Sequence, residues 1–467
     1  MNTALVLIDF IGCPRNMLLK LRIEDYLKAN GWAILSPSKL KSCDLIVFCS
    51  CGYITPIQKR SFHIISTVNK RISKFKKPPM FIVTGCVPNI NRKALLLVHD
   101  GPAFGPRQLD HFDRVINATT RIANIPCRNK VMTTERVPVA IKSSMCVAIL
   151  KKFFEIAKDV NTTTISIHHR IFKRYLPSEP QNDFPFDYYQ MGDETICVTT
   201  SIGCLGNCSY CAIRFAKGRL KSRPPGDIIE EAIQGVKLGH KWISLIADDN
   251  GSYGRDIGTN FVTLLRELCN IEGDFNILID SLNPNHFIEM FDELRDVFNT
   301  GKIKSICLTI QHVNSRILSS MNRSYDVDKL KQCLSNPSTT LPAFIVDAHF
   351  IVGYPGETEE EFEELVSFAK WFLNQNSMNS WNAFPFSSNQ GTLAAKLDKQ
   401  ISKEIIRKRL KKISRVRLQY DYNQYMEHIN EVPRPLLSKI MYKGLRRLES
   451  IGSILEKILI KLGERKI

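Results

Sequence analysis

Three cysteines in a short loop are the residues of this chain best placed to do chemistry. Cys204, Cys208 and Cys211 are spaced C-x3-C-x2-C, and their loop follows the apolar run 195–199. Thiolates this close together can reach three corners of one iron–sulfur cube, whereas a complete set of ligands comprises four cysteines. A cube held by three cysteines leaves one iron open. Because an open metal position can bind a cofactor or a substrate, the spacing indicates a cluster that takes part in chemistry.

A structural zinc site is the alternative use of such cysteines. Zinc sites usually combine one C-x2–4-C pair with a second, distant pair, and their four positions are all filled. The three-cysteine run of 204–211 does not have this form. The spacing therefore favours the iron–sulfur cluster.

A second set of cysteines follows three apolar runs near the N-terminus. Cys13 comes after the run 4–9, Cys51 after 44–48 and Cys86 after 80–84. Short apolar runs separated by helical stretches are typical of a doubly wound parallel sheet, which binds ligands outside the carboxyl ends of its strands. Buried core cysteines are common, but a core cysteine would lie within a strand. We therefore expect these three to converge on a second cluster.

Composition limits the class of protein. The 467 residues are 44% hydrophobic, which is ordinary for a globular chain, and the length suggests about two or three domains. The 14 cysteines do not form the disulfide framework of a short secreted protein. The N-terminus lacks a basic signal-peptide region, and no apolar run approaches the ~20 residues that span a bilayer. We expect a cytoplasmic protein with no membrane partner.

The charge distribution points to a polyanionic partner. The net charge is +18, and residues 396–467 hold 19 Lys and Arg against 8 Asp and Glu, so +11 of it lies there. Clustered basic charge is typical of nucleic-acid binding, although a solvated helix face would have the same composition. This stretch reads as helical over 402–428, with Pro433 and Pro435 ending that helix and a second amphipathic stretch over 436–462.

The middle of the chain alternates strand and helix. Six apolar runs read as strands, at 195–199, 242–247, 275–279, 305–310, 348–352 and 380–386. Helices are predicted between them at 226–238, 260–268, 286–298, 326–334 and 358–373. Such alternation implies a parallel sheet, and six units are too few for a closed eight-stranded barrel. We expect a partial (β/α)6 barrel whose chemistry lies at the carboxyl ends of its strands, where the Cys204 loop begins.

The predicted organisation is an α/β protein in four parts. An N-terminal Rossmann-like domain covers 1–105, a linker or insertion 106–190, the barrel 191–395 and a basic helical tail 396–467. Within 106–190 we expect a helix at 144–157 and a turn-rich stretch at 177–186, with Cys127 and Cys146 as inert thiols.

At this point the sequence resembles the methylthiotransferase family of radical S-adenosylmethionine (SAM) enzymes. The resemblance extends to about residue 428. Besides the two cysteine sets it rests on motifs in the family's order: Lys217-Gly218-Arg219 with Ser222-Arg223-Pro224, Asp249 to Gly254, Asn283-Pro284, Met321 to Tyr325, Ile351 to Phe362, and Phe386 with Gly391-Thr392. The Cys204 loop with Ala216-Lys217-Gly218 favours the branch that acts on threonylcarbamoyladenosine in tRNA.

The resemblance implies two [4Fe-4S] clusters and SAM as cofactors. Cys204, Cys208 and Cys211 would hold the cluster that cleaves SAM to a 5′-deoxyadenosyl radical. Cys13, Cys51 and Cys86 would hold an auxiliary cluster that presents sulfur. Asp249 and Gln311 are the expected SAM contacts, since both lie at carboxyl ends of predicted strands; a purely structural role is the alternative for each.

Two departures from the family pattern bear on the substrate. Gln311-His312-Val313-Asn314 stands where members usually have Gln-Ser-Gly-Ser. Members also usually end in a small β domain, called TRAM, that grips RNA, but the stretch after His428 has helical spacing instead. The basic helices would then replace that grip, or the substrate is not a standard tRNA.

The expected activity is insertion of sulfur at an unactivated C–H followed by methylation, at C2 of a hypermodified adenosine in tRNA. An adenine C2–H has no acidic proton, so no side-chain general base is assigned. An external electron donor and a sulfur source would be needed. Two alternatives stay open: methylthiolation of a protein or peptide side chain, and a non-catalytic iron–sulfur protein that binds RNA. The retained cysteines and glycine turns argue against the second.

Overall fold

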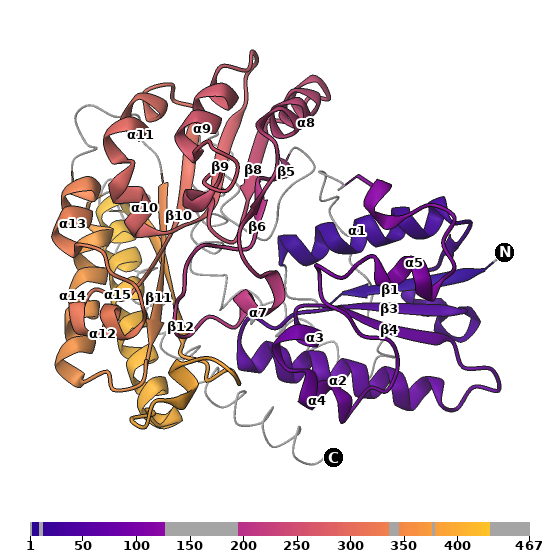
Figure 1. The fold of residues 1–467 in the computed structure, drawn as a ribbon. Coiled ribbons are helices and arrows are strands. Elements are labelled where there is room, and N and C mark those ends of the chain that lie inside the picture. The colour runs from indigo at the N-terminus through magenta and orange to yellow at the C-terminus, as the bar shows by residue number, and fades with distance from the viewer. Residues whose placement is uncertain (1, 9–12, 127–194, 336–344, 376–378, 430–467) are drawn as a thin grey trace. The chain divides into compact units, whose positions relative to one another are not determined.

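The computed structural model describes residues 2–8, 13–126, 195–335, 345–375 and 379–429 (Figure 1). The described residues up to Ile413 fall in a first compact unit, and those of 414–429 fall in a second. The first unit holds both cysteine sets. The predicted features at 144–157, 177–186 and 436–462, together with Cys127 and Cys146, lie outside the described residues.

The N-terminal sheet is parallel throughout, with strand order β2-β1-β3-β4. Its strands are β1 (Thr3–Ile8), β2 (Ala33–Ile34), β3 (Leu45–Ser50) and β4 (Met80–Gly85). The three strands predicted from apolar runs are confirmed. The two-residue β2 is too short to give a sequence signal.

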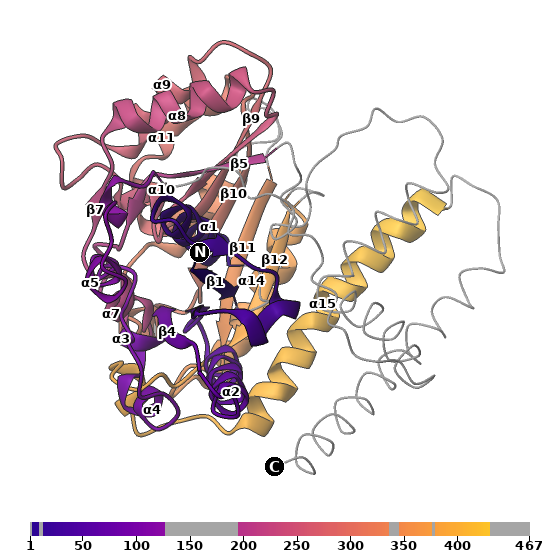
Figure 2. The same ribbon diagram turned by 90° about the vertical axis from the view of Figure 1, so that its right-hand side faces the viewer.

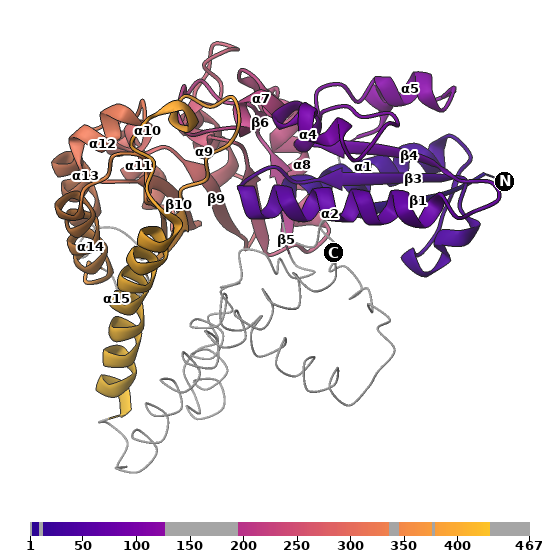
Figure 3. The ribbon, with the colours of Figure 1, turned by 90° about the horizontal axis from the view of Figure 1, so that it is seen from below.

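Helices cover both faces of this sheet (Figures 1 and 3). On one face, α1 (Pro14–Ala29) and α5 (His111–Val115) pack Ile23, Tyr26 and Phe112 onto the strands. On the other, α2 (Thr55–Ile72) packs Ile65 and Val68. The remaining elements are short: η1 (Pro37–Ser42), α3 (Val87–Ile90), α4 (Arg92–Leu96) and η2 (Ile122–Asn124).

The second sheet has six parallel strands in the order β12-β11-β10-β9-β8-β5. They are β5 (Thr195–Thr199), β8 (Trp242–Ile246), β9 (Asn276–Leu282), β10 (Ile303–Gln311), β11 (Ile345–Val352) and β12 (Ser380–Pro385). All six predicted strands are present. Strands β5 and β12 are not paired with each other, so the barrel is open, as expected from six units.

Helices line the outer face of this sheet (Figures 1 and 2). They are α8 (Pro225–Lys237), α9 (Phe261–Cys269), α10 (Pro284–Glu289), α11 (Phe291–Phe298), α12 (Ser315–Ser320), α13 (Val327–Ser335) and α14 (Glu359–Leu373). The single helix predicted at 286–298 was wrong: α10 ends before Met290, and α11 begins after it. Shorter elements are β6 (Ser201–Ile202), which pairs with β7 (Lys221–Ser222), α7 (Ile213–Lys217), η3 (Asn250–Ser252) and η4 (Ala394–Lys396).

Strand β11 shows how the barrel separates its two faces. Phe350 is buried and meets Phe368 of α14 edge-on, with ring centroids 6.1 Å apart, so alternate residues face the helices. Asp347 and His349 lie on the opposite, inner face because successive strand residues point to opposite sides. The inner face of this strand is therefore polar.

The chain continues past the barrel as α15 (Lys403–Ile429), which agrees with the predicted helix at 402–428. Among the described residues, no helix is both long and apolar enough to cross a bilayer.

Candidate functional site

The structure brings the three N-terminal cysteines together. Cys13 precedes α1, Cys51 follows β3, and Cys86 lies between β4 and α3. The Cys51 thiol donates a hydrogen bond to Cys13, and Cys86 lies within electrostatic reach of both. Parallel strands end at one edge of a sheet, which explains how residues so far apart in sequence meet.

The electrostatics of this group suit a bound cluster. The hydrogen bond from Cys51, helped by Arg15, lowers the pKa of Cys13 to about 6 although burial opposes it. The hydrogen bond to Cys13 and burial raise the pKa of Cys51, and burial raises that of Cys86. Without a metal, this group shares protons between thiols. Cluster iron, which binds thiolates, would replace those protons.

Gly85 explains how Cys86 comes so close to β3. Its φ is +89°, and a Cβ there would lie 2.2 Å from the carbonyl oxygen of Ser50. Only glycine fits this approach. The Cys86 amide then donates to the same Ser50 oxygen at 3.0 Å, which fixes the cysteine beside the end of β3.

The Cys204 loop begins just beyond β5 and turns its sulfur atoms toward hydrogen-bond donors. The Gly206 amide lies 3.1 Å from Cys204 Sγ, and Arg323 Nη1 lies 3.6 Å from Cys208 Sγ. The amides of Ile213 and Arg214 donate to Cys211. Hydrogen bonds to cysteine sulfurs are one of the ways in which proteins stabilise and tune iron–sulfur clusters.

Burial raises the pKa of two thiols of this loop. It raises the pKa of Cys204 to about 12, with help from Asp249, and that of Cys211 to about 11. All three cysteines are partly exposed and lie within electrostatic reach of one another. These three cysteines lie close together, are partly exposed and have hydrogen-bond donors beside their sulfur atoms. This arrangement fits a cluster with one open iron.

A short helix connects the two cysteine groups. Helix α7, which follows Cys211, packs Ala212 and Ala216 against Cys86 and Ile90 in one small apolar cluster. At its end Lys217 is buried and lies within electrostatic reach of Cys13 and Cys86. The helix that leaves the Cys204 loop thus packs directly against Cys86.

Arg15 makes a second connection, two residues after Cys13. Its Nη2 donates to Asp280 Oδ2 on β9 at 2.8 Å, and it also bonds the carbonyl of Ala247. Its Nε lies 3.5 Å from Asp248, which accepts a bond from the Gly203 amide at 2.7 Å. This pairing holds the N-terminal domain at the carboxyl edge of the barrel.

Asp249 is buried beside the Cys204 loop. One carboxylate oxygen accepts from the amides of Gly251 and Asn283, and the other accepts from Ser252 at 2.6 Å. Cys204 Sγ lies 3.8 Å from the second oxygen. The carboxylate therefore joins two strand ends next to the predicted cluster.

Gln311 lies at the end of β10 with a φ of +69°, which is uncommon for a residue with a side chain. The hydroxyl of Tyr325 reaches the carbonyls on both sides, at 2.8 Å for Ile310 and 2.5 Å for His312. Strained backbone held in place by its surroundings is frequent at ligand sites. Asp249 and Gln311 both lie at carboxyl ends of barrel strands, and their role as SAM contacts stays a prediction.

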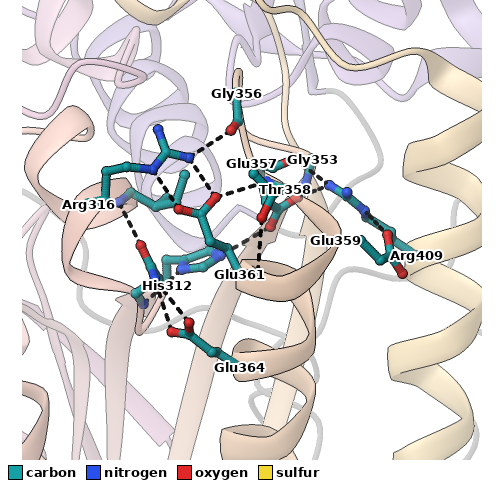
Figure 4. Close-up of polar contacts among 12 residues, drawn as sticks. His312, Arg316, Gly353, Gly356, Glu357, Thr358, Glu359, Glu361, Glu364 and Arg409 are labelled. Atoms are coloured by element: carbon teal, nitrogen blue, oxygen red, sulfur yellow. Dashed lines mark hydrogen bonds and ion pairs between the residues drawn. The ribbon is translucent and has the colours of Figure 1, made fainter.

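His312, which departs from the family pattern, is fully buried and anchors this turn (Figure 4). Its Nδ1 accepts from the Asn314 amide at 3.0 Å, so the proton is on Nε2, which donates to Glu357 at 3.1 Å. The other Glu357 oxygen accepts from the Gly353 amide and from Arg409, both at 2.7 Å. The altered loop therefore clamps the ends of β10 and β11 to α15.

Comparison with known proteins identifies the family. Residues 198–369 match the model of the radical SAM superfamily, and residues 5–102 match that of uncharacterized protein family UPF0004. A probable threonylcarbamoyladenosine tRNA methylthiotransferase of Pyrococcus horikoshii is 36% identical over 443 residues, which cover 94% of this chain and 90% of that protein. The chain belongs to the radical SAM methylthiotransferase family. A ribosomal protein uS12 methylthiotransferase of Syntrophomonas wolfei is 29% identical over 93% of this chain and 88% of its own length.

The fold agrees with this membership. The radical SAM methyltransferase TsrM of Kitasatospora setae, solved with tryptophan and a SAM analogue, has a TM-score of 0.51 and 14% identity. The match covers 82% of this chain and 73% of that one. As a member of the family, this methylthiotransferase uses two [4Fe-4S] clusters and SAM, as predicted.

Sequence reasoning missed residues whose role depends on distant partners. Arg15 and Lys217 act across the two domains, and Arg323 touches Cys208 from more than 100 residues away. Arg323 and Lys217 were visible only as members of family-like motifs. Nothing in the sequence around Arg15 marks it, apart from its place beside Cys13.

One expectation about the basic tail was wrong. Arg409, which the charge count places among residues available to RNA, is 6% exposed. It bonds Glu357 at 2.7 Å and Glu359 at 3.2 Å (Figure 4). The Arg409 charge is therefore paired with glutamates of the barrel, whereas Arg407, Lys408, Lys411 and Lys412 are exposed.

Proposed function

We propose that this methylthiotransferase acts on tRNA and replaces the hydrogen at C2 of threonylcarbamoyladenosine with a methylthio group. The observation that carries the proposal is the packing of α7 on the Cys86 region. The helix after the Cys204 loop packs against Cys86 of the second cysteine group, which supports a reaction that uses both groups. Several relatives named for this tRNA nucleoside, including a second Pyrococcus protein 28% identical over 94% of this chain, support the choice of substrate.

We assign the metal ligands accordingly. Cys204, Cys208 and Cys211 hold the cluster that binds SAM, and Cys13, Cys51 and Cys86 hold the auxiliary cluster. When bound, these groups supply hydrogen abstraction from an unactivated C–H and delivery of sulfur and methyl to the carbon. Electrons and sulfur come from outside the chain, from an external donor and a sulfur source.

The chain's own residues place charges beside the cluster cysteines and orient SAM. Arg323 places a positive charge beside Cys208, and Lys217 places one beside Cys13 and Cys86. The Lys217 charge lowers the pKa of Cys13 and of Cys86, against the effect of burial. Asp249 and Gln311 are the proposed SAM contacts, each at the carboxyl end of a barrel strand. No side chain is assigned as a general base, because the C2 hydrogen is not acidic.

Exposed basic residues near the start of α15 are the proposed tRNA contacts. Arg407, Lys408, Lys411 and Lys412 lie on the surface of this helix. Lysine and arginine at such positions can neutralise phosphates.

The test is mass spectrometry of nucleosides from total tRNA of cells with and without the gene. We expect a methylthio derivative of threonylcarbamoyladenosine that disappears when the gene is deleted and returns with the intact gene but not with Cys208→Ala. Unchanged tRNA nucleosides, together with loss of a methylthio group from a ribosomal-protein peptide, would overturn the substrate assignment.

A further inference from the structure

A third group of metal-ligating side chains lies inside the barrel, apart from both cysteine sets. Cys307 on β10 is in register with Asp347 on β11, and His349 follows two residues later on the same face. Each offers one ligand atom, and these atoms all lie within 4.8 Å of one another. Cys307 is buried, while the side chains of Asp347 and His349 are 14% and 19% exposed. The group is therefore largely buried but is still accessible to solvent through Asp347 and His349.

The three ligand atoms lie close enough together to bind one tetrahedral ion. Cys307 Sγ lies 3.6 Å from His349 Nε2, and that nitrogen lies 3.2 Å from Asp347 Oδ2. Zinc bonds of the usual lengths at tetrahedral angles place sulfur and nitrogen about 3.6 Å apart, and nitrogen and oxygen about 3.4 Å apart. Two of the three separations are thus close to those around a tetrahedral ion, and the third, between sulfur and oxygen, is within 4.8 Å.

A proton relay of the Cys–His–Asp kind does not fit the same geometry. Such a relay uses opposite ring nitrogens, one toward the nucleophile and one toward the carboxylate. Here Cys307 Sγ is nearly equidistant from the two ring nitrogens of His349, at 3.6 Å from Nε2 and 3.8 Å from Nδ1, so it lies beside the ring and not in front of either nitrogen. Asp347 approaches Nε2. The relay geometry is therefore absent, and a turn of the His349 ring would direct Nε2 at an ion held between the sulfur and the carboxylate.

The surroundings orient the carboxylate for this role. Asp347 Oδ1 accepts from Ser380 Oγ at 2.6 Å and from Asn382 Nδ2 at 3.2 Å, both on β12. Oδ2 faces His349 Nε2 at 3.2 Å and also accepts from Asn382 Nδ2 at 3.4 Å. Hydrogen bonds of this kind to a ligating carboxylate fix its orientation and typically change metal affinity about 10- to 100-fold.

Charge balance favours a divalent ion. A Cys307 thiolate and an Asp347 carboxylate bring two negative charges into a largely buried site, and His349 binds as neutral imidazole. A divalent cation neutralises the pair, which removes the cost of burying unpaired charge. The mixed sulfur, nitrogen and oxygen set suits a borderline-soft ion such as zinc.

We propose that Cys307, Asp347 and His349 form a zinc site with an open fourth position inside the barrel. Three protein ligands and one open position are the pattern of zinc that binds water or a substrate oxygen. Tyr53, two residues after Cys51, lies within electrostatic reach of His349, Cys307 and Cys211. The ring of Phe384 packs against both His349 and Tyr53, with centroids 5.2 and 6.1 Å away. The ion would therefore face the space between the two cysteine groups.

The test is metal analysis of the anaerobically purified holoenzyme, supplied with zinc during expression and then desalted. We expect one zinc per chain in addition to the cluster iron. His349→Ala and Cys307→Ser should lose the zinc and keep the iron. The matched control is Cys269→Ser, a buried cysteine at the end of α9, which should keep both. Zinc content unaffected by His349→Ala, or no stoichiometric zinc in the unaltered protein, would overturn the proposal.

A spectroscopic measurement separates this site from zinc trapped at the cluster cysteines. Zinc K-edge absorption of the unaltered protein should show one sulfur neighbour near 2.3 Å and otherwise nitrogen or oxygen. Three or four sulfur neighbours would contradict the assignment. Ser380→Ala, which leaves all three ligands in place, should weaken zinc affinity by roughly 10- to 100-fold in competition with a chelator. Iron content and tRNA modification report on the proposed function separately, so failure of one proposal does not imply failure of the other.

Discussion

Arg15 Nη2 donates to Oδ2 of Asp280 at 2.8 Å, although the two residues are 265 positions apart. The Asp280 side chain is only 7% exposed, and Arg15 pairs with it from the N-terminal domain. Because Arg15 is two residues from Cys13, the pair couples the position of one cysteine group to the barrel. The relative placement of the two proposed clusters therefore rests on a contact between side chains as well as on the folds themselves.

The first prediction concerns this pair. Arg15→Ala should reduce tRNA modification by roughly 10- to 100-fold, because a shift of about 1 Å in a reacting group has effects of that size. Iron content and SAM cleavage without substrate should stay near normal, since neither cysteine set is changed. Arg114→Ala, at a side chain 77% exposed on the same domain, is the control. Equal activity in the two variants would show that Arg15 is not needed for positioning.

The second prediction concerns cluster number. Anaerobic reconstitution should give about eight irons per chain, as expected for two four-iron clusters. Replacement of Cys204, Cys208 and Cys211 by Ala should leave about half, as should replacement of Cys13, Cys51 and Cys86. Iron analysis with Mössbauer spectroscopy measures this directly. About four irons in the unaltered protein, unchanged by the second triple replacement, would rule out the auxiliary cluster.

The third prediction separates Arg409 from its exposed neighbours. Arg409→Gln leaves the Glu357 carboxylate, which is fully buried, without its cationic partner. Removal of one member of a buried pair typically costs about 3–5 kcal/mol, so the thermal unfolding midpoint should fall by several degrees. Arg407→Gln, at an exposed position in the same helix, should not change it. A common midpoint for both variants would contradict the role given to Arg409 in the clamp.

The fourth prediction concerns the grip on RNA. Changing Arg407, Lys408, Lys411 and Lys412 to Gln, with Arg409 retained, should weaken tRNA binding. It should also flatten the log–log salt dependence by about three units, since each phosphate contact contributes about 0.7–0.9. The charge-matched control changes four exposed lysines of the N-terminal domain: Lys70, Lys74, Lys76 and Lys77. The same affinity and slope in both variants would move the proposed substrate toward a protein or peptide.

Much of the fold could be predicted because its signal is local. An apolar run such as 44–48 marks a buried strand by itself, and the cysteine just after it then has to lie at the sheet edge. The break at Met290 was missed because the apolar spacing continues through it. Arg15 was missed because its partners lie on the other domain. Arg409 was misread because a charge count cannot distinguish an exposed cation from a buried one.

The cysteine, aspartate and histidine on the inner face of the barrel were not predicted for a different reason. Asp347 and His349 alternate with buried apolar residues along β11, and Cys307 lies on another strand. Only the register between β10 and β11 brings the three together. A single amino-acid sequence does not reveal how two strands are aligned with each other, so this group of three residues could not be predicted.

The most direct test of the proposed function is one anaerobic reaction with the holoenzyme, SAM, a reductant, a sulfide source and tRNA that carries threonylcarbamoyladenosine. The unaltered enzyme should form both 5′-deoxyadenosine and the methylthio nucleoside. Cys208→Ala should form neither product. Cys51→Ala should still form 5′-deoxyadenosine but attach no sulfur, because only the Cys204 loop is assigned to SAM. Normal methylthio nucleoside from Cys51→Ala, or loss of SAM cleavage in a variant that keeps its barrel cluster, would contradict the division of labour between the two cysteine groups.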